Sequence, residues 1–153
     1  MNIRLASIDD AEIISALIYA LAEKYVVPEF PIHAANALLV SMLPEGIRKH
    51  MHSGCRYQVA ESNGQVIGVI CMKDNKHLYH LFVAEAHQRK GIAHGLWQAA
   101  LAASQATGYT GGFTVNSSKQ LLGMYEKLGF IAQPVSRTRD GVISIPMVYA
   151  PPR

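Results

Sequence analysis

The chain has 153 residues, of which 50% are hydrophobic and 16% are charged. This length is typical of one domain, and we expect a single domain over residues 1–153. The composition excludes an intrinsically disordered chain, which combines low hydrophobicity with high net charge. Fourteen Lys and Arg against 11 Asp and Glu give a net charge of +3. That excess is too small for a dedicated nucleic-acid binder, so we expect no nucleic-acid partner, although it suits a small phosphate-bearing molecule.

The two cysteines, Cys55 and Cys71, lie in or beside apolar runs that are typical of strands. We therefore expect free thiols in a reducing compartment rather than a disulfide framework. The first ten residues lack the apolar segment of a signal peptide. No apolar run approaches the ~18 residues that span a bilayer. These features predict a cytoplasmic protein without a membrane partner.

The first third of the chain predicts a short strand followed by two helical regions. Ser7 and Asp10 have the spacing of a capping box that opens the first helix, and Pro28 and Pro31 end it. A Pro-Glu-Gly sequence interrupts the second helical region. The predicted elements are a strand over 3–6, a helix with its apolar face at 13–21, and a helical region over 34–52.

From residue 57 onward, segments whose apolar residues follow the period of a strand occur together with segments that follow the period of a helix. Asn63-Gly64, a strong two-residue hairpin signal, joins the first two of these strands, and Asp74-Asn75 marks another turn. Further strands are predicted over 57–61, 65–72, 78–84, 111–115, 130–133 and 142–149, and helices over 91–107 and 121–128. In the strand over 78–84, alternation predicts one face with Tyr79, Leu81 and Val83 and another with Leu78, His80 and Phe82. This order of elements predicts an α/β sandwich with a mixed sheet.

The segment Gln88-Arg89-Lys90-Gly91-Ile92-Ala93 places a strand, a short loop and the start of a helix together. A helix N-terminus offers unpaired N–H donors and a partial positive charge, which favour a phosphate group. Gly91 has no Cβ and Ala93 a small side chain, so a phosphate can approach the backbone, and Arg89 and Lys90 add charge. The residues alone leave open an ordinary loop with a solvated basic pair. The segment is neither a P-loop nor a dinucleotide fingerprint.

A second segment, Tyr-Glu-Lys-Leu-Gly-Phe at residues 125–130, follows after one helix and one strand. Together the two segments resemble the GNAT N-acetyltransferase superfamily. Residues 88–93 resemble its Gln/Arg-x-x-Gly-x-Gly/Ala acetyl-CoA loop, and residues 125–130 resemble its C-terminal motif. The order of the elements also agrees, so the resemblance covers nearly the whole chain. It implies a GNAT-type α/β sandwich: a mixed, mostly antiparallel sheet of about six to seven strands, flanked by about four helices and splayed between the fourth and fifth strands.

The resemblance implies an acetyl-CoA-dependent N-acetyltransferase that moves an acetyl group to a primary amine of a small amine, an amino acid, or a peptide or protein. Acetyl-CoA would lie where the strands over 78–84 and 111–115 splay apart. Family members often carry Asn at the position of Ser118, whereas this chain has Ser there and Asn at 116. The implied cofactor-binding residues are Phe82 and Val83 for the pantetheine arm, Gln88, Arg89, Lys90, Gly91, Ile92, Ala93 and His94 for the pyrophosphate, and Asn116, Ser118 and Tyr125 along the cleft.

By the resemblance, Tyr125 matches the family's general acid. Its phenol, with a pKa of ~10, stays protonated at neutral pH. The residues alone also allow a helix tyrosine that packs under the last strand. A base must remove a proton from the amine before it attacks, and we expect His80 in this role because histidine titrates in the right range. The alternatives are Glu23, Glu29, Glu85 or an ordered water chain. His77 and His87 are expected to be surface or hydrogen-bonded core histidines, and no metal site is expected because His77 and His80 should face opposite ways.

The resemblance implies an acceptor pocket formed by residues 25–45 and 136–148. The stretch over 25–31 mixes apolar and acidic residues, which suits an amine that carries an apolar body. Many family members form homodimers, but the sequence shows no distinct interface signal. The alternative function is a non-catalytic acyl-CoA-binding sensor or regulatory module, which would keep the phosphate loop but need neither Tyr125 nor a base.

Overall fold

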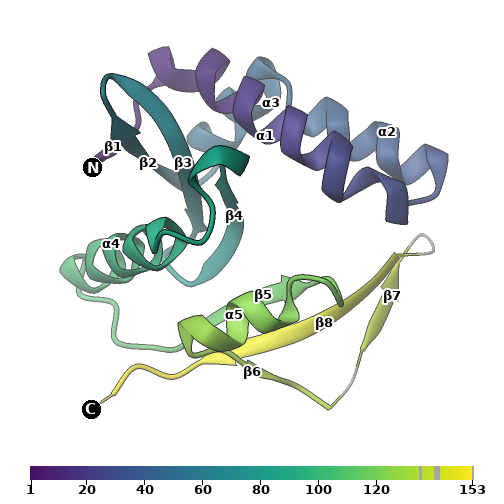
Figure 1. Ribbon diagram of the computed structural model, residues 1–153. Helices are drawn as coiled ribbons and strands as arrows, with labels where there is room; N and C mark the ends of the chain where they lie inside the picture. Colours follow the sequence, from purple (N-terminus) through teal and green to yellow (C-terminus); the bar gives the residue numbers. More distant parts are fainter. Residues whose placement is uncertain (135, 140–141, 153) are drawn as a thin grey trace.

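The computed structural model describes residues 1–134, 136–139 and 142–152. This part of the chain contains five α-helices and eight strands (Figure 1). None of its helices is long and apolar enough to cross a membrane. The elements are β1 (Asn2–Leu5), α1 (Ala11–Tyr25), α2 (Ile32–Ser41), α3 (Pro44–His52), β2 (Cys55–Ser62), β3 (Gln65–Lys73), β4 (His77–Val83), α4 (Ile92–Ala106), β5 (Phe113–Ser117), α5 (Leu122–Leu128), β6 (Ile131–Ala132), β7 (Arg137–Arg139) and β8 (Val142–Tyr149), with short 3-10 turns η1 (Ile8–Asp10), η2 (Val27–Glu29) and η3 (Glu85–His87).

The strands form one sheet in the order β1-β2-β3-β4-β5-β8-β6, and β7 pairs with β8 beside this path. Neighbours are antiparallel except β4 and β5, which are parallel. Within the described residues, β4 and β5 are paired only at His77 and Thr114. The two halves of the sheet therefore diverge from this point into a V. The mixed, mostly antiparallel sheet with a splay between its fourth and fifth strands confirms the predicted fold.

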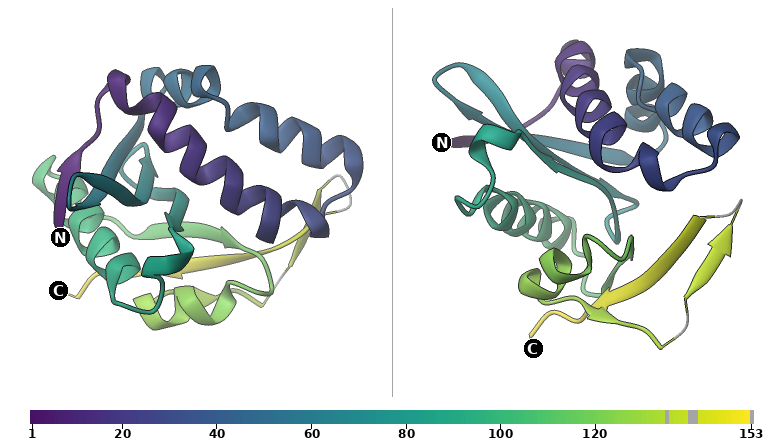
Figure 2. Two further views of the ribbon diagram at one scale, coloured as in Figure 1. Left: turned by 45° about the horizontal axis from the view of Figure 1, so that its top comes forward. Right: turned by 45° about the vertical axis from the view of Figure 1, so that its right-hand side comes forward.

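Helices cover both faces of the sheet (Figures 1 and 2). We call the side that carries α1, α2 and α3 the α1 face, and the side that carries α4 and α5 the α4 face. The core on the α4 face is built around three aromatic rings: Phe113 packs edge-on against Trp97, and Phe130 packs against it at a tilt. The core on the α1 face holds Ile14 and Ile18 from the predicted apolar face of the first helix. Burial of these apolar surfaces is the main force that holds the layers together.

A β-bulge interrupts β4 at Tyr79, where the register with β3 shifts by one residue. Leu78 therefore lies in the core on the α4 face with Leu81. Tyr79 packs on the ring of His80, with 4.5 Å between the ring centroids. The prediction that Leu78 and His80 share a face is wrong, because strict alternation fails at a bulge. Bulges also bend a strand, and this one lies two residues after His77, where β4 pairs with β5.

Most of the predicted turns are confirmed. The predicted helices and strands differ from the structure in the number of helices, in the bounds of one strand and in one additional strand. Asn63 and Gly64 both have positive φ, +53° and +75°, and close the hairpin of β2 and β3. The helical region over 34–52 is divided by its proline into α2 and α3, which gives five helices instead of about four. β5 begins and ends two residues later than expected, and the short strand β7 was not predicted.

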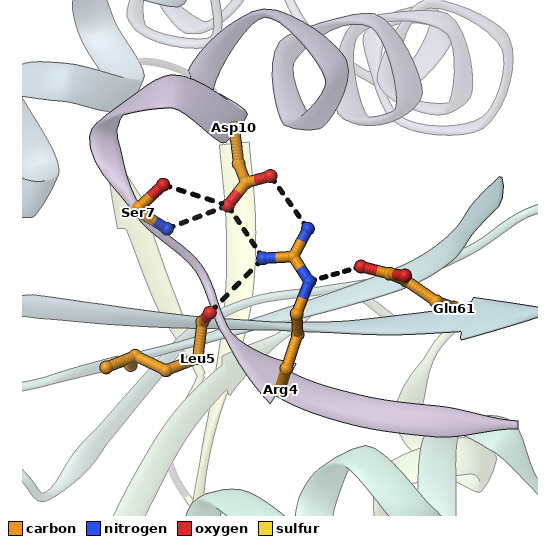
Figure 3. A network of polar contacts seen from close by, with 5 residues as sticks. All are labelled: Arg4, Leu5, Ser7, Asp10 and Glu61. Carbon is orange, nitrogen blue, oxygen red and sulfur yellow. Dashed lines mark hydrogen bonds and ion pairs between the residues drawn. The ribbon is translucent and has the colours of Figure 1, made fainter. Parts of the chain in front are cut away.

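The capping box at the start of the chain is part of a wider polar network (Figure 3). The backbone N–H of Ser7 donates to Asp10 Oδ2 at 2.8 Å. The Arg4 guanidinium donates to both carboxylate oxygens of Asp10, each at 2.8 Å, and also binds Glu61. The Arg4 hydrogen bonds hold the pKa of Asp10 at about 2. This network fixes β1 to β2 and to the beginning of α1.

Candidate functional site

The free edge of β4 lies where the two halves of the sheet diverge, and we call this V-shaped opening between β4 and β5 the cleft. One edge of β4 pairs with β3 up to Val83. On the other edge, the described residues pair with β5 only at His77. Beyond that point the backbone N–H and C=O groups on this edge have no strand beside them, and an extended ligand can pair with such an edge like an added strand. Phe82 and Val83, predicted to contact the pantetheine arm, lie at the open end of this edge.

The loop after β4 leads into a helix end that suits an anion. Gln88 Nε2 donates to the carbonyl of Val83 at 2.9 Å, which fixes the loop to the strand end. Arg89 and Gly91 both have left-handed backbones, with φ of +63° and +80°. No side chain caps the N-terminus of α4, and its first turn has no acidic residue. Its first N–H groups therefore remain available to an anion.

Gly91 meets the two requirements of this position, a left-handed backbone and open space for a ligand. Its positive φ strongly favours glycine, and a Cβ built there would have nothing within 4 Å. The space in front of the backbone is thus open to a ligand. The exposed side chains of Arg89, Lys90 and His94 surround the same turn, whereas Ile92 is buried.

Gly68 is a residue of this region that the sequence analysis missed. It pairs with Val83 in the sheet. A Cβ on Gly68 would lie 3.0 Å from Leu96 Cδ1 and 3.2 Å from Ile92 Cγ2, both in α4. The glycine therefore lets the first turns of α4 approach the sheet beside the end of β4. A glycine inside an apolar strand was the signal that indicates such an approach.

Tyr125 lies in α5 and is only 6% exposed. Its ring packs edge-on against Phe130, with 5.9 Å between centroids. Burial raises the pKa of Tyr125, because a low-dielectric surrounding disfavours the phenolate. The phenol is therefore protonated at neutral pH. The position of Tyr125 is thus compatible both with a packing role against Phe130 and with the role of an acid.

Asn116 and Ser118 lie at the end of β5, on the other side of the cleft. Because β5 reaches Ser117, Asn116 lies within the strand rather than in a loop, and it is exposed. Thr114 and Asn116 alternate with the buried Phe113, Val115 and Ser117, which places these two side chains on the α1 face. Ser118 Oγ accepts a hydrogen bond from the backbone N–H of Leu121 at 3.3 Å, so it also supports the turn into α5.

His80 lies on the α1 face and is 6% exposed. Its Nδ1 is 3.0 Å from the hydroxyl of Tyr57, and its ring lies edge-on to that of His50. Burial, with a smaller effect of His50, lowers the pKa of His80 to about 3. The ring is therefore neutral at pH 7 and holds a proton only weakly, which disfavours it as a base that carries a full proton.

The alternative bases are more exposed. Glu23 and Glu29 are exposed near the end of α1. Glu85 forms an ion pair with Lys24, whose Nζ lies 3.0 Å from both carboxylate oxygens. His77 Nδ1 is 2.7 Å from Thr114 Oγ1, and no cluster of the described His, Cys, Asp and Glu side chains is arranged to hold a metal ion. Of the implied acceptor region over 136–148, residues 140–141 lie outside the described residues.

The family model of the acetyltransferase (GNAT) domain matches residues 26–151. The chain belongs to the GNAT acetyltransferase family. No curated protein sequence matches it, but solved structures share the fold. A GCN5-related N-acetyltransferase from Rhodopseudomonas palustris has a TM-score of 0.81 at 17% identity, over 97% of this chain and 94% of that one. PaiA N-acetyltransferase from Thermoplasma acidophilum, in complex with coenzyme A, has a TM-score of 0.77 at 18% identity, over 98% and 99%. Ribosomal-protein-alanine N-acetyltransferase from Brucella melitensis has 0.71 at 14%, over 98% and 99%.

Proposed function

We propose that this GNAT protein transfers the acetyl group of acetyl-CoA directly to a primary amine. The observation that carries the proposal is the continuity of two binding features. The free edge of β4 ends at Val83, and an uncapped helix N-terminus follows it eight residues later at Gly91. An extended arm joined to a pyrophosphate fits this succession, because the arm can pair with the strand and the phosphates can bind the amides. The PaiA structure, determined with coenzyme A, supports coenzyme A as the ligand.

In this proposal, the backbones of Phe82 and Val83 bind the pantetheine arm. The amides of Arg89, Lys90, Gly91, Ile92, Ala93 and His94 bind the pyrophosphate. Gln88 acts through its hydrogen bond to the Val83 carbonyl, which holds the loop in place. Asn116 and Ser118 line the opposite side of the cleft. The protein acts as a single domain over residues 1–153.

The reaction needs a neutral amine, a polarised thioester carbonyl and a proton for the leaving thiolate. The amine nitrogen forms the new C–N bond to the carbonyl carbon, the C–S bond breaks, and the thiolate receives a proton. We assign this last proton to Tyr125. Burial raises the pKa of Tyr125 further above the ~8.5 of a thiol, so complete transfer of its proton to the thiolate is uphill. The phenol therefore acts mainly through the hydrogen bond that it donates to sulfur, which stabilises the developing charge.

The amine must lose a proton, and because the low pKa of His80 disfavours it as the group that holds this proton, we assign the removal to a water chain that His80 orients through a hydrogen bond. At neutral pH the His80 ring is unprotonated and so able to accept a hydrogen bond. With a pKa of about 3, it would pass a proton on rather than hold it. Glu23, Glu29 and Glu85 remain alternative bases.

Thermal unfolding with and without acetyl-CoA, followed by thiol release with a panel of amines, tests the function. A ligand that binds only the folded state adds ~2.7 kcal/mol of stability at a hundredfold excess over Kd. A raised Tm with thiol release establishes the enzyme and names its acceptor class. A raised Tm without release from any amine supports the sensor instead, and an unchanged Tm contradicts the cofactor site.

The variant Tyr125→Phe tests the acid. We expect kcat to fall ~10²-fold or more, as for loss of a proton donor, while the Kd for acetyl-CoA changes little, because the hydroxyl acts mainly in the transition state. Tyr109→Phe is the matched control, since the Tyr109 hydroxyl bonds to the Gly112 carbonyl away from the cleft. Equal kcat in Tyr125→Phe and the wild type would remove Tyr125 from the mechanism.

A further inference from the structure

A side-chain bridge joins the two halves of the sheet at the narrow end of the cleft. His77 Nδ1 in β4 lies 2.7 Å from Thr114 Oγ1 in β5. The same two residues form the pair between these strands, and the backbone N–H of Thr114 donates to the carbonyl of Lys76 at 2.9 Å. Backbone and side chains thus close the V at one place.

The bridge lies on the α1 face of the sheet. Leu78, next to His77, is buried on the α4 face, as are Phe113 and Val115 on either side of Thr114. The two bridging side chains therefore point to the same face as Asn116, which is two residues further along β5. His77 is half-buried and neutral at pH 7, because burial and then Lys73 lower its pKa. The bridge is thus an uncharged contact at the point where the two halves of the sheet meet.

The direction of the cofactor follows from the order of the elements. If the pyrophosphate binds at residues 88–94, as the proposed function states, the pantetheine arm runs from Val83 back toward the start of β4. From Val83 to His77 the strand is ~20 Å long at ~3.3 Å per residue. The acyl group at the end of the arm then points toward His77 and Thr114.

We propose that the bridge between His77 and Thr114 sets the length of acyl group that the cleft accepts, and that it restricts the enzyme to acetyl-CoA. This inference rests on the proposed function. The chemistry stays the same for each donor: the amine forms the C–N bond, the C–S bond breaks, and the thiolate is protonated. Only the space beyond the carbonyl carbon changes. One additional methylene group changes kcat/KM by ~10- to 200-fold in a shaped site.

The test is the ratio of kcat/KM for propionyl-CoA to that for acetyl-CoA. We expect Thr114→Ala, which removes one partner of the bridge, to raise this ratio at least tenfold. Thr114→Ser keeps the hydroxyl and should retain the wild-type ratio. Thr107→Ala is a control for loss of a threonine hydroxyl elsewhere, because Thr107 Oγ1 bonds to Ser104 at the end of α4. His77→Ala removes the other partner and should act like Thr114→Ala.

A general loss of stability would lower both kcat/KM values and leave their ratio unchanged. An unchanged ratio in Thr114→Ala and His77→Ala, with measurable acetyl transfer, would therefore overturn the inference. Failure of the wild type to release thiol from acetyl-CoA with any amine would instead contradict the proposed function. The two failures are thus distinguishable in one set of assays.

Discussion

Replacing Gly91 by Glu tests the phosphate site most directly. The new side chain would begin in open space, since no atom lies within 4 Å of a Cβ at this position. It would place a carboxylate where the proposed pyrophosphate binds. Two unit charges of the same sign, ~5 Å apart, repel by about 2–3 kcal/mol at an effective dielectric constant of ~20–40. We therefore expect a ~30- to 150-fold loss of acetyl-CoA affinity, by the conversion of 1.4 kcal/mol per tenfold.

Strain contributes separately to stability. Any residue with a Cβ is strained at the φ of +80° found here, at a cost of about 1–2 kcal/mol. The matched control is Gly108→Glu, because Gly108 also has a positive φ, +94°, and open space around it, at the opposite end of α4. Both variants should lose stability, and Gly108→Glu slightly more, because a carboxylate is unfavourable at a helix C-terminus.

The assay is the rise in Tm with acetyl-CoA, supported by titration calorimetry. At a ligand concentration that stabilises the wild type by ~2.7 kcal/mol, a hundredfold loss of affinity leaves only ~0.4 kcal/mol. The Tm shift should therefore almost vanish in Gly91→Glu and persist in Gly108→Glu. Wild-type affinity in Gly91→Glu would mean that the pyrophosphate binds elsewhere. Equal losses in both variants would mean that the effect is global.

Two further predictions concern stability. The folded-state pKa of His80, about 3, lies below the ~6.5 of an unfolded histidine, so the stability that neutral His80 contributes is present above pH 6.5 and is lost as the pH falls toward 3. The free energy of unfolding, measured with urea, should fall by about 2 kcal/mol between pH 7 and pH 5 because of this group. His80→Gln should not show this loss. Parallel pH profiles of stability for the two proteins would refute the prediction. Arg56→Met should destabilise the fold by about 2 kcal/mol, because Arg56 donates to Asn75 Oδ1 at 2.6 Å and Ser104 Oγ at 2.7 Å. The exposed ion pairs of Arg48 make Arg48→Met a control that should change stability by less than about 1 kcal/mol, and equal urea midpoints for the two variants would contradict the assignment.

The sequence predicted those features that depend on a few neighbouring residues. The capping box at Ser7 and the hairpin at Asn63-Gly64 are local, because their backbone conformations follow from the residues that adopt them. The loop over 88–93 is also local, since Gly91 supplies its own left-handed backbone. These elements, taken in order, predicted an α/β sandwich with a mixed sheet, and the resemblance to the GNAT superfamily implied the splay between the fourth and fifth strands.

Features that depend on register could not be predicted in this way. The bulge at Tyr79 arises from the pairing of β3 with β4, and the sequence of either strand alone does not indicate it. The bulge reversed the predicted face of Leu78. The environment of His80 likewise depends on Tyr57 and His50 from other elements, so its low pKa was not visible from its position in a strand. Contacts between distant segments decide these properties.

The same distinction explains why the cofactor site is easier to predict than the acceptor. β4 and the turn that follows it carry the free edge, the fixed loop and the helix end, all within residues 77–94. One continuous segment therefore contains most of the chemistry that a pyrophosphate and an extended arm require. The implied acceptor region instead combines α1 and α2 with the strands after residue 136, which are far apart in the chain. Its specificity depends on how these elements meet, so an amine panel is needed to identify the acceptor.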